Sequence, residues 1–150
     1  MKIILNKCYG GFGVSTEAYQ LYARKKGFEL YPYIHIGRYM TGNTDECCFK
    51  KIEWKNIMFS NIATIKYFYL KKDYGDKISE EDFEEIDDDY IWIDESYRTD
   101  PVLIDVVEEL GVYASGIGSK LIVVDIPDDL DYVIDKKDGL EVLHQKVQTW

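Results

Sequence analysis

Three glycines near the start of the chain lie where an anion could bind. Residues 10–13 read Gly-Gly-Phe-Gly; they follow an apolar segment and precede Ser15, a typical helix N-cap residue. Backbone N–H groups at a helix N-terminus suit a phosphate or a carboxylate. The pattern is not G-x-G-x-x-G, and Val14 stands where a Walker loop has its lysine. A tight turn that needs positive φ angles is the structural alternative.

Arg98 is a second candidate for binding an anion. It is one of three arginines, and it stands just before Asp100 and Pro101, which suit a helix N-cap and first helical position. Its guanidinium fork matches a phosphate beside that helix start. An ion pair with a carboxylate such as Asp100 is the alternative that we favour.

The cysteines and histidines predict neither a metal site nor nucleophilic catalysis. No pair has C-x-x-C or H-x-x-x-H spacing. A Cys8 nucleophile would need one of only two histidines as its base, so we expect Cys8 to be a buried structural thiol. An odd cysteine count without an export signal predicts reduced thiols. The residues considered are Cys8, Cys47, Cys48, His35 and His144.

Acidic residues are concentrated in the middle of the chain. Residues 73–95 carry twelve acidic side chains and one basic one, whereas residues 50–72 hold six lysines against one glutamate. The acids lack the spacing of a calcium-binding loop. They form either a solvated face or a phosphate-mimicking surface, within residues 80–95, that binds a basic groove of a host protein. The acidic block disfavours direct binding to nucleic acid or to an anionic membrane.

Aromatic residues are abundant in the same region. Fifteen of the 22 aromatic side chains lie between residues 28 and 98. Such residues usually form the core of a sheet, and they also provide platforms on which a base can stack. Their number exceeds what a small sheet needs, so we expect some to be exposed or to lie at a subunit interface.

Hydrophobic periodicity and turn residues predict an α+β chain. We expect helices over residues 15–26, ended by Gly27, over 79–86 and over 101–110. Strands are predicted at 2–7, 28–36, 63–70, 90–94, 121–126 and 132–135. Asp138 and Glu141 have capping-box spacing for a last helix over 140–147, and an edge strand there is the alternative. The predicted architecture is a single domain, a mixed β-sheet with two or three helices packed on it.

The chain resembles a family of small uncharacterised proteins encoded by phages and prophages. The resemblance covers about residues 1–27 and 97–150, and it implies that the β-rich, aromatic-rich residues 28–98 are a divergent insertion. It departs at 147–149, where His-Arg is expected before the final Trp150. It implies a phage accessory protein that counters host defence, and it supplies no catalytic residue. The motifs that carry it are N-K-C-Y-G-G-F-G-V-S-T-E-A, R-T-D-P-V-L, V-V-E-E-L-G, I-V-V-D-I-P-D-D and D-G-L-E-V-L-H.

These features together favour a non-catalytic protein that sequesters a small nucleotide-like ligand as a homo-oligomer, without cofactor or metal. No apolar run reaches the ~18–20 residues of a membrane span, so we expect a cytoplasmic protein. One alternative is an acidic interaction protein that mimics nucleic acid and inhibits a host enzyme; another is a hydrolase of a nucleotide signal. The expected ligand-binding residues are Asn6, Gly10, Gly11, Phe12, Ser15 and Arg98.

Overall fold

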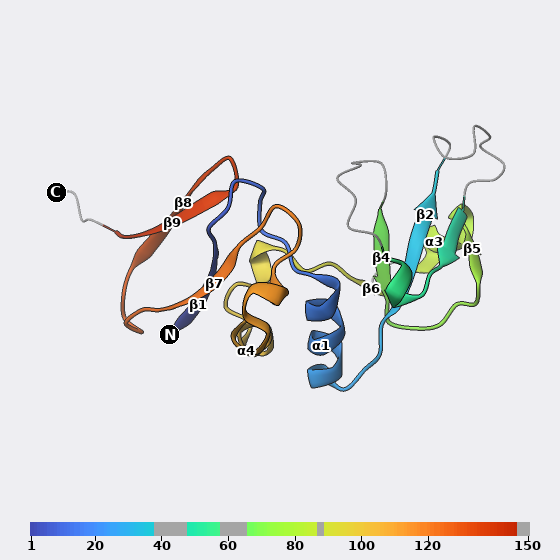
Figure 1. Cartoon of the computed structure of the whole chain (residues 1–150), viewed down its shortest axis with the longest axis horizontal. Coiled ribbons are helices and arrows are strands. Elements are labelled where there is room, and N and C mark those ends of the chain that lie inside the picture. Colours follow the sequence, from blue (N-terminus) through green and yellow to red (C-terminus); the bar gives the residue numbers. More distant parts are fainter. Residues whose placement is uncertain (38–47, 58–65, 87–88, 147–150) are drawn as a thin grey trace. The chain divides into compact units, whose positions relative to one another are not determined.

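The computed structural model describes residues 1–37, 48–57, 66–86 and 89–146. The predicted α+β class is confirmed, with helices packed on β-sheets. The chain divides into two compact units (Figure 1). Unit 1 combines Met1–Lys26 with Ile93–Trp150, and unit 2 is Gly27–Trp92. Unit 2 contains most of the aromatic-rich segment.

Unit 1 contains a two-stranded antiparallel sheet, two helices and a β-hairpin. β1 (Lys2–Asn6) pairs with β7 (Leu121–Asp125), and β8 (Tyr132–Lys137) pairs with β9 (Leu140–Gln145). Helix α1 (Thr16–Lys26) packs against α4 (Pro101–Leu110). Short 3-10 turns η3 (Glu95–Tyr97) and η4 (Gly111–Ala114) flank α4. The fully buried apolar residues of this unit are Ile3, Ile4, Ala18, Leu103, Val106 and Ala114.

The helix ends in unit 1 follow from capping chemistry. The Ser15 hydroxyl accepts a hydrogen bond from the Ala18 N–H, which caps α1. The Asp100 carboxylate accepts hydrogen bonds from the N–H groups of Val102 and Leu103, which confirms the predicted cap of α4. Both local predictions succeed because a cap is set by residues three or fewer positions apart.

The helix predicted over residues 140–147 is wrong, and the edge-strand alternative is confirmed. Asp138 and Gly139 have φ angles of 51° and 92°, so both residues occupy the left-handed region. Positive φ at two consecutive residues is typical of the tight turn that joins two antiparallel strands, and Asp-Gly favours it. Lys137 and Leu140 flank this turn as partners of the β8–β9 pair. Residues 147–150 lie outside the described residues.

Unit 2 is built on a five-stranded antiparallel sheet with the order β5-β3-β2-β4-β6. The strands predicted at 28–36 and 90–94 are shorter in the structure, and residues 63–65 of the strand predicted at 63–70 lie outside the described residues. The sequence patterns did not predict β3 and β5. The 3-10 turn η2 (Trp54–Asn56) and helix α3 (Glu80–Ile86) complete the described part of the unit. The strand bounds are β2 (Tyr31–Ile36), β3 (Cys48–Lys51), β4 (Tyr67–Leu70), β5 (Lys77–Ser79) and β6 (Tyr90–Ile91).

The core of unit 2 is aromatic. Tyr33, Phe49, Leu70 and Ile78 form a buried cluster. Phe83 of α3 stacks on Phe49 with a centroid separation of 3.7 Å. Aromatic side chains therefore form much of the sheet core, as the sequence predicts. Phe83 packs α3 against the sheet.

Candidate functional site

The glycine loop packs closely against two other loops of unit 1. A Cβ on Gly10 would lie 1.9 Å from the Gly118 carbonyl oxygen, and a Cβ on Gly139 would lie 2.4 Å from the Gly11 nitrogen. Only glycine permits backbones to approach so closely. We call these four residues the glycine junction. It joins the loop after β1, the loop before β7 and the β8–β9 turn.

The side chain of Asn6 makes hydrogen bonds to the segments that meet at the glycine junction. It is fully buried; Nδ2 donates to the carbonyl oxygens of Cys8 and Gly139, and Oδ1 accepts from the Lys120 N–H. The Asn6 backbone N–H donates to Glu141 Oε1 at 2.9 Å. Both amide hydrogens of the side chain are therefore used within the protein.

Arg98 forms a buried ion pair with Glu141. Its Nη1 and Nη2 atoms donate to Glu141 Oε1 and Oε2 at 3.1 and 2.7 Å, and Nη1 also donates to the Ile4 carbonyl oxygen. The Glu141 side chain is 1% exposed and that of Arg98 is 15% exposed. The Arg98 guanidinium lies 5.6 Å from the centroid of the Phe12 ring.

Hydrogen bonds to Glu141 lower its pKa in this ion pair. Burial by itself raises the pKa of Glu141, but hydrogen bonds from Arg98 and from the Asn6 N–H outweigh it and lower the pKa below its ordinary value. The ion pair expected for Arg98 exists, but with Glu141 and not with Asp100. Asp100 caps α4 and accepts a hydrogen bond from the Tyr22 hydroxyl.

The structure therefore brings most of the predicted ligand-binding residues together. Gly10 and Gly11 belong to the glycine junction, Asn6 bonds to Gly139, and Phe12 lies over the Arg98 guanidinium. The Ser15 hydroxyl instead caps α1 and donates to the Tyr113 carbonyl oxygen. The polar side chains among them make hydrogen bonds within unit 1. The surface around the junction displays Tyr9, Tyr113 and Ile117, which are 68%, 73% and 54% exposed.

Each unit contains one described cysteine and one histidine: Cys8 and His144 lie in unit 1, and Cys48 and His35 lie in unit 2. Cys8 is half-buried, unlike the fully buried thiol that we expected, and Cys48 is buried. His35 Nε2 lies 2.9 Å from Glu80 Oε1, and His144 Nε2 lies 3.0 Å from Asp135 Oδ2. Among the described residues, no group of three or more His, Cys, Asp or Glu side chains could hold a metal ion. Cys47 lies outside them.

Helix α3 displays five acidic residues of unit 2. Glu80, Glu81, Asp82, Glu84 and Glu85 are all exposed, whereas Phe83 packs inward on the core. The Ser79 hydroxyl accepts from the Asp82 N–H, as the sequence predicted. Within the described ranges, the His35–Glu80 pair is the only contact between a basic side chain and these five carboxylates.

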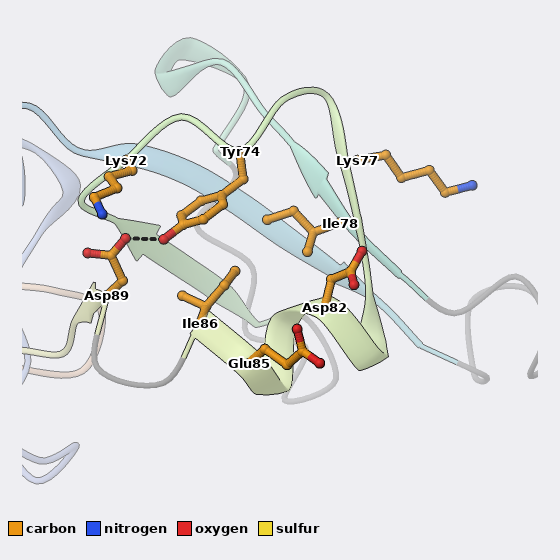
Figure 2. A pocket seen from close by; sticks show the side chains of 8 residues that line it. All are labelled: Lys72, Tyr74, Lys77, Ile78, Asp82, Glu85, Ile86 and Asp89. Carbon is orange, nitrogen blue, oxygen red and sulfur yellow. Dashed lines mark hydrogen bonds between the residues drawn. The ribbon is translucent and has the colours of Figure 1, made fainter.

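A pocket of about 690 Å³ lies beside α3 (Figure 2). The side chains of Ile78, Ile86 and Tyr74 supply its apolar lining. The Tyr74 hydroxyl donates a hydrogen bond to Asp89, which raises the pKa of Tyr74 to about 12. The tyrosine therefore stays neutral at physiological pH. The charged residues of the lining are Lys72, Lys77, Asp82, Glu85 and Asp89.

Comparison with known proteins does not extend these observations. No family model matches the chain, and no curated protein or solved structure is significantly similar to it. Across the described ranges, no helix is long and apolar enough to cross a lipid bilayer. The function must therefore be argued from the geometry of the two surfaces.

Sequence reasoning missed two features of these surfaces. The capping-box spacing predicts that Glu141 lies in the first turn of a helix. The Asp138–Gly139 pair is also a hairpin signal, and this signal would have placed Glu141 on a strand. No sequence pattern indicated the pocket beside α3, because its lining residues come from separate segments that include the helix, β5 and the segment before β5.

Proposed function

We propose that this chain is a non-catalytic interaction protein whose helix α3 binds a basic surface of another protein. The observation that carries the proposal is the charge of α3. Five of its seven residues are acidic, and none is basic. Glu80 and Glu84, like Glu81 and Glu85, are four positions apart, and like charges at this spacing repel. Glu84 and Glu85 also face the negative end of the helix dipole.

This unfavourable arrangement is relieved by a basic partner. Glu80–Asp82 suit the first turn, but the acids of the last turn have no compensating base. Phe83 holds the helix on the sheet by stacking on Phe49, so the carboxylates are presented on a fixed scaffold. Carboxylates held in this way resemble the phosphates of a nucleic acid in charge. The groove of a nucleic-acid-binding host protein is the partner that fits, in agreement with the resemblance to phage proteins.

Removing two of the carboxylates tests the proposal. In the double variant Glu81→Gln with Glu84→Gln, we expect affinity for purified nucleic-acid-binding host proteins to fall by about tenfold or more. The melting temperature should rise by about 1–3 °C, because repulsion within the helix is relieved. Duplex DNA should compete with the wild-type protein for the same partner.

A matched control removes the same charge from unit 1. Asp105 and Asp129 are exposed, and the double variant Asp105→Asn with Asp129→Asn should retain partner binding. If this control loses as much affinity as the α3 variant, net charge alone drives the association and the proposal fails. Failure of DNA to compete would remove the mimicry of nucleic acid.

A second function is favoured by the exposed aromatic residues around the glycine junction. Tyr9 and Tyr113 are more than two-thirds exposed although they flank loops fixed by close backbone contacts. The glycine loop precedes the N-terminus of α1, where backbone N–H groups suit an anion. Exposed aromatic side chains near such a loop suit a small nucleotide-like ligand. Sequestration of such a ligand, by a homo-oligomer, is the function that this surface would perform.

Thermal shift measurements test the second function. A panel of mononucleotides, cyclic dinucleotides and cyclic ADP-ribose-type molecules should contain a stabiliser of the wild-type protein. Linkage predicts about 2.7 kcal/mol at one hundred times the dissociation constant. The double variant Tyr9→Ala with Tyr113→Ala should keep its fold and lose the stabilisation. Recovery of a cleaved compound after multiple turnovers would instead identify a hydrolase. If no compound of the panel stabilises the protein, sequestration of these ligand classes is excluded.

A further inference from the structure

We propose that the pocket beside α3 receives an arginine side chain of the basic partner. This inference rests on the proposed function, and it names the chemistry that the partner must offer. The volume of about 690 Å³ lies in the range of ligand-binding pockets, so an arginine can enter together with neighbouring atoms of its own chain.

The apolar lining suits the stem of a long basic side chain. Ile78 is 4% exposed and belongs to the buried core, so it forms a fixed floor. Figure 2 shows the side chains of Ile78, Ile86 and Tyr74 directed toward one another in the middle of the pocket. Lysine and arginine commonly bury their methylene groups along such surfaces while the charged head reaches a polar rim.

Two carboxylates of α3 form that rim. Asp82 and Glu85 are three positions apart, so they lie on the same face of the helix. In the described part of the chain, neither carboxylate has a hydrogen-bond or ion-pair partner. The planar guanidinium carries several N–H donors in a fixed fork, so it can donate to two carboxylates at once, whereas an ammonium is a single point charge. These contacts favour arginine over lysine.

Lys72 and Lys77, which also line the pocket, do not prevent a cation from binding at its acidic end. Figure 2 shows Lys77 extending away from the isoleucines, and Lys72 lying at the opposite end beside Tyr74 and Asp89. The surrounding segment, residues 73–95, carries twelve acids against one base. The end of the pocket that contains Asp82 and Glu85 is therefore its cation-binding end.

Peptide titration of the intact chain, followed by NMR, tests the inference. The probes are acetyl-Gly-Arg-Gly-amide and its citrulline analogue, which has nearly the same shape without the charge. The arginine peptide should shift the amide signals of residues lining the pocket and bind about tenfold or more tightly than the citrulline peptide. A third peptide, in which lysine replaces the arginine, should bind more weakly than the arginine peptide. Spermidine, added alone, should not reproduce the shifts.

Two double variants separate the pocket from the rest of the helix. Asp82→Asn with Glu85→Gln should lower the affinity for the arginine peptide by about tenfold or more, because both rim carboxylates are lost. Glu81→Gln with Glu84→Gln removes the same charge outside the pocket lining and should lower it by less than about threefold.

Each failure has a distinct meaning. Equal losses in the two variants, equal binding of arginine and citrulline, or no binding of the arginine peptide would overturn the pocket assignment. The proposed function would survive any of these results, provided that Glu81→Gln with Glu84→Gln still lowers the affinity for the whole partner protein by about tenfold or more. If spermidine reproduces the shifts, the pocket is a site for small organic cations and the assignment to a partner's arginine is wrong.

Discussion

Replacing Glu141 by glutamine is expected to lower the free energy of unfolding at pH 7 by about 3–5 kcal/mol, the usual consequence of breaking a buried ion pair. Glu141 accepts hydrogen bonds from both terminal nitrogens of Arg98 and from the Asn6 N–H. A glutamine amide would leave the Arg98 charge, which is largely buried, without its counter-charge. It would also turn a hydrogen-bond donor toward at least one of these N–H groups.

The effect of this substitution should depend on pH. Because the pKa of Glu141 in the folded protein lies below its ordinary value of 4.5, the ion pair contributes fully above that value. The contribution is lost as the pH falls through the folded-state pKa. The wild type and the variant should therefore differ most near pH 7 and should converge in more acidic solution. Urea denaturation at a series of pH values measures this difference.

Glu108→Gln is the matched control. Glu108 pairs with Lys2 in the same unit at 2.8 Å, but both side chains are more than 40% exposed. An exposed pair contributes about 0–1 kcal/mol, so the control should be nearly neutral. Similar losses for the two variants would show that burial does not strengthen the Arg98–Glu141 pair.

Local chemistry explains what the sequence could predict. The caps of α1 and α4 and the Ser79 cap of α3 each depend on a side chain and an N–H group no more than three residues apart. The acidic face of α3 was visible for the same reason, since three acids precede Phe83 and two follow it in the sequence. Patterns of this kind need no knowledge of the rest of the fold.

Long-range contacts explain what the sequence could not predict. Arg98 and Glu141 are 43 residues apart, and nothing in either segment identifies the other as its partner. The D-G-L-E segment is compatible with both a capping box and a tight hairpin turn, and nothing in it indicates that Gly139 packs against Gly11. The glycine loop likewise resembled an anion site, because its contacts with Gly118 are made only in the folded chain.

Substituting alanine for Gly10 should destabilise unit 1 by about 3 kcal/mol or more, since the added methyl group overlaps backbone atoms that cannot rotate away. Its Cβ would lie 1.9 Å from the Gly118 carbonyl oxygen. Gly13→Ala is the control, because a Cβ there meets nothing within 4 Å and its φ is not positive. The melting temperature of Gly13→Ala should match the wild type, while that of Gly10→Ala falls sharply. If the two variants melt together, the loops are not in contact, and the glycines would be free to serve a ligand instead.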